Sequence, residues 1–469
     1  MKLWGGRFAR GGRDPLFEKF CESFSLDQRL VHYDLSVNQA YVRALGRAGV
    51  LRPAEVRRLT RGLESLRRHV ERHPHWARGV FAEDVHTWVE GKLEGEVGEI
   101  ARKLRTGRSR NDLVASEVRL FAKDSIRRLQ SAALDFLKAL LERARELLGA
   151  VMPGYTHLQP AQPVLFSHYL LAYFEMLLRD ASRLEECRAR ADELPLGAGA
   201  LAGSSFPIDR QRLAKELGFA RVARNSLDVT SDRDFVCELV FACALALTHL
   251  SRWAEDLLIF SSPGFGYVEL AEAYSTGSSL MPQKKNADSL ELIRGKTARV
   301  AGRLASLVAL LKGLPLAYNR DLQEDKAALF DTVDTTRDAL ELAARVMRTL
   351  TVYPERMKAA TLEGFLTATD LAEELVRRGV PFATAHEQVG KLVLSCVREG
   401  KTFADLEPEE ARRFVPAWDE QLRAVALSPE VAVGRRDVVG GTAPSQVARQ
   451  IAQGERRLAA LRRDFGPSK

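Results

Sequence analysis

Cysteine is scarce in this sequence, and no two cysteines are spaced as in a CxxC motif. The chain has 469 residues and five cysteines, at positions 21, 187, 237, 243 and 396. The odd number and the spacing argue against a disulfide framework and a zinc ribbon. The N-terminus MKLWGGRFARGG also lacks the apolar segment of an export signal. These absences predict that the chain resides in the reducing cytoplasm.

Long apolar runs and blocks of like charge are absent as well. Apolar residues make up 46% and charged residues 28% of the chain, which is typical of globular proteins and excludes disordered and collagen-like chains. The most apolar stretch, residues 235–247, contains Glu238 and is too short to span a bilayer, so we expect no membrane partner. The net charge of +8 comes from basic residues interleaved with acidic ones, which favours a solvated surface over a nucleic-acid partner.

Proline and glycine are missing from Asp112 to Leu148, where apolar residues recur at helical spacing. Such a helix is about 50 Å long at the usual rise per residue. Four further segments predict long helices: 164–193, 231–261, 286–312 and 323–350. Shorter helical pieces flank them, and alternating strand patterns are almost absent. The sequence therefore predicts a mainly α fold with a central long-helix bundle, in three parts: an N-terminal helical domain at 1–105, the bundle at 106–355 and a C-terminal helical domain at 356–469.

The segment DFVCELVFACALALTHL, at 234–250, is apolar nearly all round. A helix of this kind must be covered on every side. Rods of this length usually cover further apolar stripes by association, so we expect a homo-oligomer. The alternative is a monomer with this helix at its centre.

The stretch TGSSLMPQKKNADSLE, at 276–291, carries the richest chemistry. A Gly–Ser–Ser tip predicts a mobile loop with two hydroxyls, and Lys284 and Lys285 add positive charge. Asn286 or Asp288 can cap the helix that follows, whose free N–H groups favour an anion. This combination suits a carboxylate ligand and a serine acting as base or nucleophile. A solvated loop with an ordinary cap is the alternative.

Four other motifs gather polar groups beside predicted helix starts. TGRSRND at 106–112 offers Arg108 and Arg110 as forked donors, or serves only as a capping segment. PGYTHLQPAQP at 153–163 holds His157 on a proline-stiffened corner. A lone histidine is more often structural than catalytic, but this rigid polar setting strengthens the case for proton transfer. LAYNRDLQEDK at 316–326 and SDRD at 231–234 also crowd polar groups at the start of a predicted helix, where they could form part of a site. The alternative for the first is a solvated face, and for the second a helix cap. No HExxH, phosphate-binding loop or dinucleotide fingerprint occurs, and we expect no metal site.

Five motifs occur in a characteristic order: WGGRF at 4–8, TGRSRND, PGYTHLQPAQP, GSSLMPQKKN and YNRDLQEDK. Together they closely resemble the signature sequences of the argininosuccinate lyase family within the fumarase/aspartase superfamily. GGTAP at 440–444 extends the resemblance over nearly the whole chain. One departure is Ala287, where the family usually has proline after the signature asparagine; alanine is also a good helix former, so we expect little loss of function.

The resemblance implies a three-domain fumarase/aspartase-like fold and reversible β-elimination of argininosuccinate to arginine and fumarate, the last step of arginine biosynthesis. It implies no metal and no organic cofactor. It also implies a homotetramer whose active sites are shared between subunits. Argininosuccinate, a small molecule, is then the expected partner besides the other subunits.

The same matching implies residue roles. Ser278 is the expected base, with Lys284 stabilising its oxyanion, and His157 paired with Glu291 is the expected proton donor. Asp27 is expected to meet the cationic end of the substrate, and Arg110 a carboxylate. The full set of expected substrate contacts is Ser23, Asp27, Ser109, Arg110, Asn111, Thr156, Arg233, Asn286, Tyr318, Gln323 and Lys326.

Three alternatives stay open at this point. One is another lyase of the superfamily, such as adenylosuccinate lyase, which differs in the pocket for the leaving group. Another is a non-catalytic structural protein on the same fold, although intact motifs argue against lost function. The third is an RNA-binding helical protein that uses the Arg-rich surface.

Overall fold

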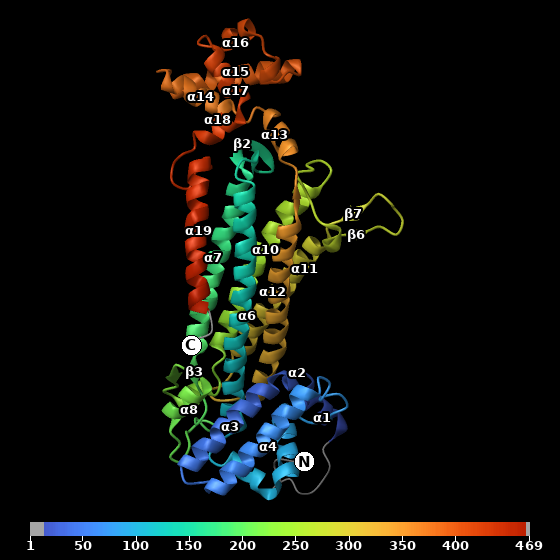
Figure 1. Ribbon diagram of the computed structural model, residues 1–469, viewed down its shortest axis with the longest axis vertical. Coiled ribbons are helices and arrows are strands. Elements are labelled where there is room, and N and C mark those ends of the chain that lie inside the picture. The colour runs from blue at the N-terminus through green and yellow to red at the C-terminus, as the bar shows by residue number, and fades with distance from the viewer. Residues whose placement is uncertain (1–13, 466–469) are drawn as a thin grey trace. The chain divides into compact units, whose positions relative to one another are not determined.

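A computed structural model describes residues 14–465, which are mainly helical and include short two-stranded sheets (Figure 1). The WGGRF motif at 4–8 lies outside the described residues. The mainly α prediction is therefore confirmed, and each two-stranded sheet is a local pairing rather than part of a larger sheet.

The five predicted long helices all form, with ends that differ from the prediction by three residues or fewer. They are α6 (Arg110–Glu146), α7 (Phe166–Ala191), α10 (Asp234–Ser261), α11 (Asp288–Leu311) and α12 (Asp325–Thr349). Side chains join neighbouring helices through ring contacts and ion pairs: Phe136 with Trp253, Phe121 with Phe330, His249 with Asp180, and Arg299 with Asp331.

By their internal contacts the residues group into two compact units. Among the described residues, unit 1 comprises 14–129, 182–245 and 298–336, and unit 2 comprises 130–181, 246–297 and 337–465. Every long helix contributes residues to both units. This grouping does not test the three sequence domains, which stay a prediction.

Unit 1 contains short helices and strands besides its part of the long helices. Within it α3 packs against α4, α5 and α8. Pro53 occupies the first turn of α4, where its missing N–H costs nothing. The elements are α1 (Pro15–Cys21), α2 (Phe24–Asp27), η1 (Gln28–Leu30), α3 (Val31–Arg47), α4 (Pro53–Arg72), α5 (Val85–Val97), η2 (Gly98–Arg105), β3 (Glu193–Leu194), α8 (Arg210–Leu217), β4 (Arg221–Val222), α9 (Ser226–Val229) and η4 (Arg320–Glu324).

Unit 2 contains the C-terminal helices, of which α14 to α17 enclose an apolar cluster that includes Leu371, Leu392 and Trp418. Gly400 ends α15 in the left-handed conformation, at a φ of 66°. The elements are β1 (Val151–Thr156), β2 (Gln159–Leu165), β5 (Val268–Glu269), η3 (Glu272–Tyr274), β6 (Thr276–Gly277), β7 (Lys285–Asn286), β8 (Thr351–Val352), α13 (Pro354–Leu362), α14 (Ala368–Arg377), α15 (Phe382–Glu399), η5 (Phe403–Asp405), α16 (Pro408–Phe414), α17 (Glu420–Leu427), α18 (Pro429–Gly434) and α19 (Pro444–Phe465).

The proline-rich corner is an antiparallel hairpin formed by β1 and β2, which the sequence did not predict. Thr156 pairs with Gln159, so His157 and Leu158 form a two-residue turn. Their φ values of 56° and 57° match a type I′ turn, whose twist suits hairpins. The prolines concealed the strands because proline lacks the N–H that a ladder uses.

The helix α10 is long and apolar enough to cross a membrane by length and composition alone, and it exceeds the apolar stretch singled out in the sequence. Half of its most apolar window is buried inside the chain. A core helix passes the same test, so this observation is weak evidence for a membrane span.

Replacing Leu247 of α10 by alanine tests how strongly this helix supports the fold. The Leu247 side chain is fully buried. Its truncation removes apolar contacts and leaves a cavity, so the free energy of unfolding should fall by about 2–5 kcal/mol. Chemical denaturation followed by circular dichroism measures the change. Leu394→Ala, at a position 49% exposed, is the matched control and should change stability far less. Equal losses in both variants would contradict a core role for Leu247.

Candidate active site

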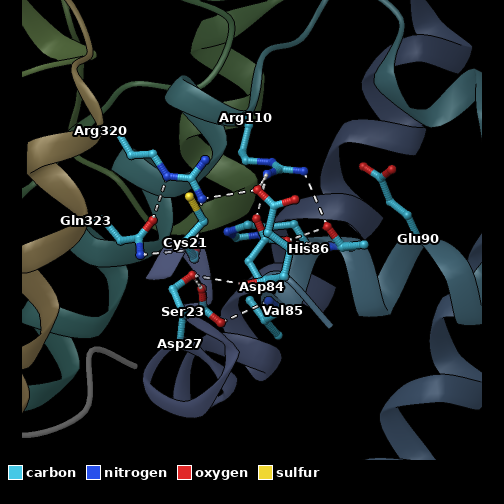
Figure 2. A network of polar contacts seen from close by, with 12 residues as sticks. Cys21, Ser23, Asp27, Asp84, Val85, His86, Glu90, Arg110, Arg320 and Gln323 are labelled. Carbon is cyan, nitrogen blue, oxygen red and sulfur yellow. Dashed lines mark hydrogen bonds and ion pairs between the residues drawn. The ribbon is translucent and has the colours of Figure 1, made fainter. Parts of the chain in front are cut away.

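The first turn of α5 is the centre of a polar network in unit 1 (Figure 2). Asp84 caps this helix by accepting the backbone N–H of Thr87 at 2.8 Å. The other carboxylate oxygen of Asp84 lies 2.6 Å from Nη1 of Arg110, at the start of α6. Although burial opposes ionisation, His86 and Arg110 hold the pKa of Asp84 below its usual range. The Arg110 guanidinium is thereby fixed at the edge of this network.

Asp27 lies on the other side of the same turn and is 2% exposed. Its carboxylate accepts the hydroxyl of Ser23 at 2.7 Å and the backbone N–H of Val85 at 2.9 Å (Figure 2). Burial raises the pKa of Asp27 to about 6, against the opposing effect of His86. This carboxyl group therefore changes charge close to neutral pH.

The helical turn η4 contributes Gln323 to the network. Arg320 donates to the backbone carbonyl of Cys21 at 2.8 Å and to the carboxylate of Glu83 at 3.1 Å (Figure 2). Its Nε also donates to the side-chain oxygen of Gln323 at 3.3 Å. Tyr318 lies just ahead of η4 and is partly buried. The structure thus brings Ser23, Asp27, Arg110 and Gln323 into one network.

The start of α6 is both a capped helix end and a source of polar groups. The Asp112 carboxylate accepts the backbone N–H of Ser109 at 3.0 Å and those of two glycines, 197 and 199, at 2.9 Å. The backbone N–H of Asn111 donates to the Ser109 hydroxyl at 3.2 Å. Burial raises the pKa of Asp112 to about 6. Ser109, Arg110 and Asn111 stay partly exposed, so the capping contacts leave their side chains accessible.

The motifs SDRD and LQEDK meet around one buried carboxylate. Asp325 is fully buried, accepts Nζ of Lys326 at 2.8 Å and pairs with Nε of Arg233. Burial favours its neutral form, yet Lys326 and Arg233 together lower the pKa of Asp325. Lys326 and Arg233 are themselves almost fully buried. The pairing compensates the buried charge of Asp325 and holds both cations in place.

The serine loop is the tip of a second hairpin, in unit 2. Thr276 pairs with Asn286 across β6 and β7, and the loop extends away from the helices of this unit (Figure 1). The Ser278 hydroxyl oxygen accepts the backbone N–H groups of Leu280 at 3.2 Å and Met281 at 3.0 Å. Asn286 lies in β7, and α11 begins at Asp288. The predicted helix segment starts at 286, so its start is two residues too early.

The expected proton-donor pair is also in unit 2. His157 and its neighbour Thr156 are exposed on the β1–β2 hairpin, and Glu291 is exposed on the first turn of α11. Within residues 14–465, the side chains of His157 and Glu291 make no hydrogen bond or ion pair, with each other or with other groups. Lys284 is exposed too. A single chain therefore presents these groups to its surroundings.

Sequence reasoning missed the acidic pair Glu83–Asp84, the neighbouring His86 and the buried Asp325. The segment EDVH was a usable signal, because two acidic residues directly precede a helix and a histidine follows within its first turn. Asp325 carried no such signal, since only the tertiary fold shows that it is buried between two cations.

Comparison with known proteins identifies the family. A model described as a lyase matches residues 6–302, and one described as argininosuccinate lyase C-terminal matches residues 365–434. The argininosuccinate lyase of Moorella thermoacetica is 48% identical over 98% of this chain and 99% of that protein. That of Pelotomaculum thermopropionicum is 49% identical over 97% of this chain and 99% of that protein.

Solved structures agree on the fold. An EDDS lyase in complex with formate has a TM-score of 0.85 and 29% identity, covering 97% of this chain and 92% of that one. A fumarate lyase from Mesorhizobium sp. BNC1 has a TM-score of 0.73 at 21% identity, covering 95% and 99%, which supports the fold alone. The chain belongs to the argininosuccinate lyase family of the fumarase/aspartase superfamily.

Proposed function

We propose that this chain cleaves argininosuccinate reversibly to arginine and fumarate, in the last step of arginine biosynthesis. The observation that carries this proposal is the identity of 48–49% to argininosuccinate lyases over nearly the full length of both chains. The reaction removes a proton from a carbon beside a carboxylate and expels a guanidinium nitrogen. The carbanion must be stabilised as an aci-carboxylate, which requires fixed donors and positive charge.

Ser278 is the proposed base. A serine hydroxyl is a weak base unless its oxyanion is stabilised, and the N–H groups of Leu280 and Met281 already point at this oxygen. Lys284, six residues further along the same loop, adds positive charge. The base then returns its proton to solvent or product at the end of the cycle.

His157 is the proposed proton donor to the leaving nitrogen, with Glu291 as its partner. The two-residue turn at the end of β1 restricts where the imidazole is presented, because both of its residues have a positive φ. Such a fixed position suits a group that must meet one atom of the substrate.

The substrate contacts are proposed residue by residue. Asp27 holds the cationic end of the arginine portion, and Arg110, Lys326 and Lys284 meet carboxylates. The remaining proposed contacts are Ser23, Ser109, Asn111, Thr156, Arg233, Asn286, Tyr318 and Gln323. The ionic network around Asp27 and Arg110 supports this assignment, because it holds charges of both signs within one unit.

The proposed working form is a homotetramer with active sites shared between subunits, acting in the cytoplasm. Exposed apolar side chains on α11 support association: Leu292 is 58% and Val308 is 55% exposed. The exposed, unpaired state of His157 and Glu291 also suits groups that other subunits complete. We propose that the enzyme uses no metal or organic cofactor and has no nucleic-acid or membrane partner.

The proposal is tested by mixing the purified protein with argininosuccinate and following fumarate by its ultraviolet absorbance, with adenylosuccinate in parallel. We expect fumarate from argininosuccinate alone. Fumarate from adenylosuccinate alone would replace the proposed substrate. Fumarate from neither, with a folded tetramer, would favour a structural protein.

Ser278→Ala should lower kcat by at least about 10³-fold, because the base is lost while the fold and the binding groups remain. Steady-state kinetics and binding of arginine by calorimetry measure both effects. Ser279→Ala is the matched control in the same loop and should retain far more turnover. Near-normal turnover by the Ser278 variant would rule it out as the base.

Mixing two inactive variants tests the shared sites. Ser278→Ala removes a group of unit 2, and Lys326→Met removes one of unit 1. If each site draws these residues from different subunits, mixed tetramers made by refolding the two variants together contain some sites with both wild-type residues. Fumarate production by the mixture, but by neither variant alone, is the expected result. A mixture as inactive as its parts would contradict sharing between subunits.

The pH dependence of kcat/KM tests Asp27. Since its pKa is raised to about 6, the carboxylate forms as pH rises through that value, and kcat/KM should rise with it. Asp27→Asn should abolish this rising limb of the kcat/KM profile. It should also raise KM by about 10- to 100-fold, because a charged contact is lost. Kinetics between roughly pH 5 and 8 measure both. A limb that persists in the variant would point to another group, such as Asp112.

A further inference from the structure

A buried cluster of three titratable side chains lies in unit 1 and has no role in the proposed reaction. Nδ1 of His86 on α5 lies 2.7 Å from the Asp34 carboxylate on α3 and 3.6 Å from the Glu117 carboxylate on α6. All three residues are 3% exposed or less. Asn38 donates to Asp34 at 2.6 Å and accepts from Arg108 at 2.7 Å.

The cluster favours a positive charge on His86. Burial alone favours the neutral imidazole, but the carboxylates of Glu117, Asp84 and Asp34 raise the pKa of His86 to about 10. Burial raises the pKa of Glu117 well above its usual range. Nδ1 of His86 faces both the Asp34 and the Glu117 carboxylate, so a positive charge on the imidazole offsets buried negative charge that would otherwise lack a counter-ion.

His86 is also placed where its position matters for the site. It is the second residue of α5, and the two residues before it make the key contacts of the network. Val85 donates its backbone N–H to Asp27 at 2.9 Å, and Asp84 pairs with Arg110 at 2.6 Å. Figure 2 shows the contacts of Val85 with Asp27 and of Asp84 with Arg110. Anchoring the imidazole between α3 and α6 therefore fixes the backbone that holds Asp27 and the side chain that holds Arg110.

We propose that His86 is a positioning residue whose buried imidazole, held between the carboxylates of α3 and α6, anchors the first turn of α5 and so acts on substrate binding through Asp27. This inference rests on the proposed role of Asp27 in binding the cationic end of the substrate. His86 itself does not touch the substrate. It acts on affinity through Asp27 and on geometry through Asp84.

The charges that face these groups are consistent with this role. Burial raises the pKa of Asp27, His86 lowers it and Asp84 raises it, so His86 is the cation that offsets the cost of burial. Around His86 the facing charged groups are Asp34 from α3, Asp84 from the cap of α5 and Glu117 from α6, with Arg108 ahead of α6 acting on Glu117.

A metal ion is the competing occupant of this cluster. The three side chains offer three ligand atoms within 4.8 Å of one another, a set that suits a divalent cation. However, a metal would need the lone pair of Nδ1, and this nitrogen faces Asp34 at hydrogen-bonding distance. The Arg108 guanidinium adds positive charge near Glu117, which disfavours a second cation.

The test compares pH profiles of kcat/KM for the wild type, His86→Gln and Asp34→Asn. Loss of the buried cation should move the rising limb, expected near pH 6 in the wild type, upward by on the order of one pH unit. At pH 6, KM should rise more than kcat falls. Asp34→Asn should move the limb in the same direction, because it removes the partner that keeps His86 protonated. His32→Gln, an exposed histidine on α3, is the matched control and should leave the limb in place.

The outcomes distinguish a positioning role of His86 from a metal site. A limb that stays near pH 6 in a folded His86→Gln tetramer would overturn the proposal, even if KM rises. Stoichiometric divalent metal in the purified wild type, measured by mass spectrometry, would overturn it in favour of a metal site. If His86→Gln does not fold, the double variant Asp34→Asn/His86→Gln removes both charges together and should show the same shift.

Failure of this inference is distinguishable from failure of the proposed function. A wild type that releases no fumarate from argininosuccinate contradicts the function itself. A wild type that turns over, with a pH limb that Asp27→Asn abolishes but His86→Gln does not move, contradicts only the role of His86.

Discussion

A buried charge is stable only when an opposite charge or a hydrogen-bond donor compensates it, and unit 1 is arranged around this constraint. Asp325 meets it with two cations, Lys326 and Arg233. Asp27 meets it with a hydroxyl and a backbone N–H, at the cost of a raised pKa. Asp325, paired with two cations, stays ionised and fixes its partners. Within residues 14–465 Asp27 has no such partner, so it can change charge close to neutral pH and is free for its proposed cationic ligand.

The long helices make such compensation possible. Groups from the starts of α5, α6 and α12 can be buried together only if their backbones are held within about an ångström, which rigid helices do and loops do not. Helix starts also bring free N–H groups, and Asp84 and Asp112 satisfy some of them while facing the network. Residues that cap helix starts in this chain therefore also lie beside the proposed substrate contacts.

The two hairpins of unit 2 hold the proposed base and the proposed proton donor outside the helices of that unit. Ser278 stands at the tip of one hairpin with two N–H groups on its oxygen, and His157 occupies the turn of the other. Both are less buried than Asp27, Asp84 and Asp325 of unit 1. Groups held in this way suit a site that is completed by association, as the family resemblance implies.

The sequence by itself determined the helices and the chemistry. Helical periodicity from Asp112 to Leu148 is a local property, and the serine, histidine and arginine motifs stand in short uninterrupted segments. Only the tertiary structure decided which groups meet. Asp325 and Arg233 are 92 positions apart, and Asp27 and Val85 are 58 apart, so their pairing depends on how distant helices pack. The burial that raises the pKa of Asp27 and the carboxylates that raise the pKa of His86 both come from that packing and are not encoded in any local pattern.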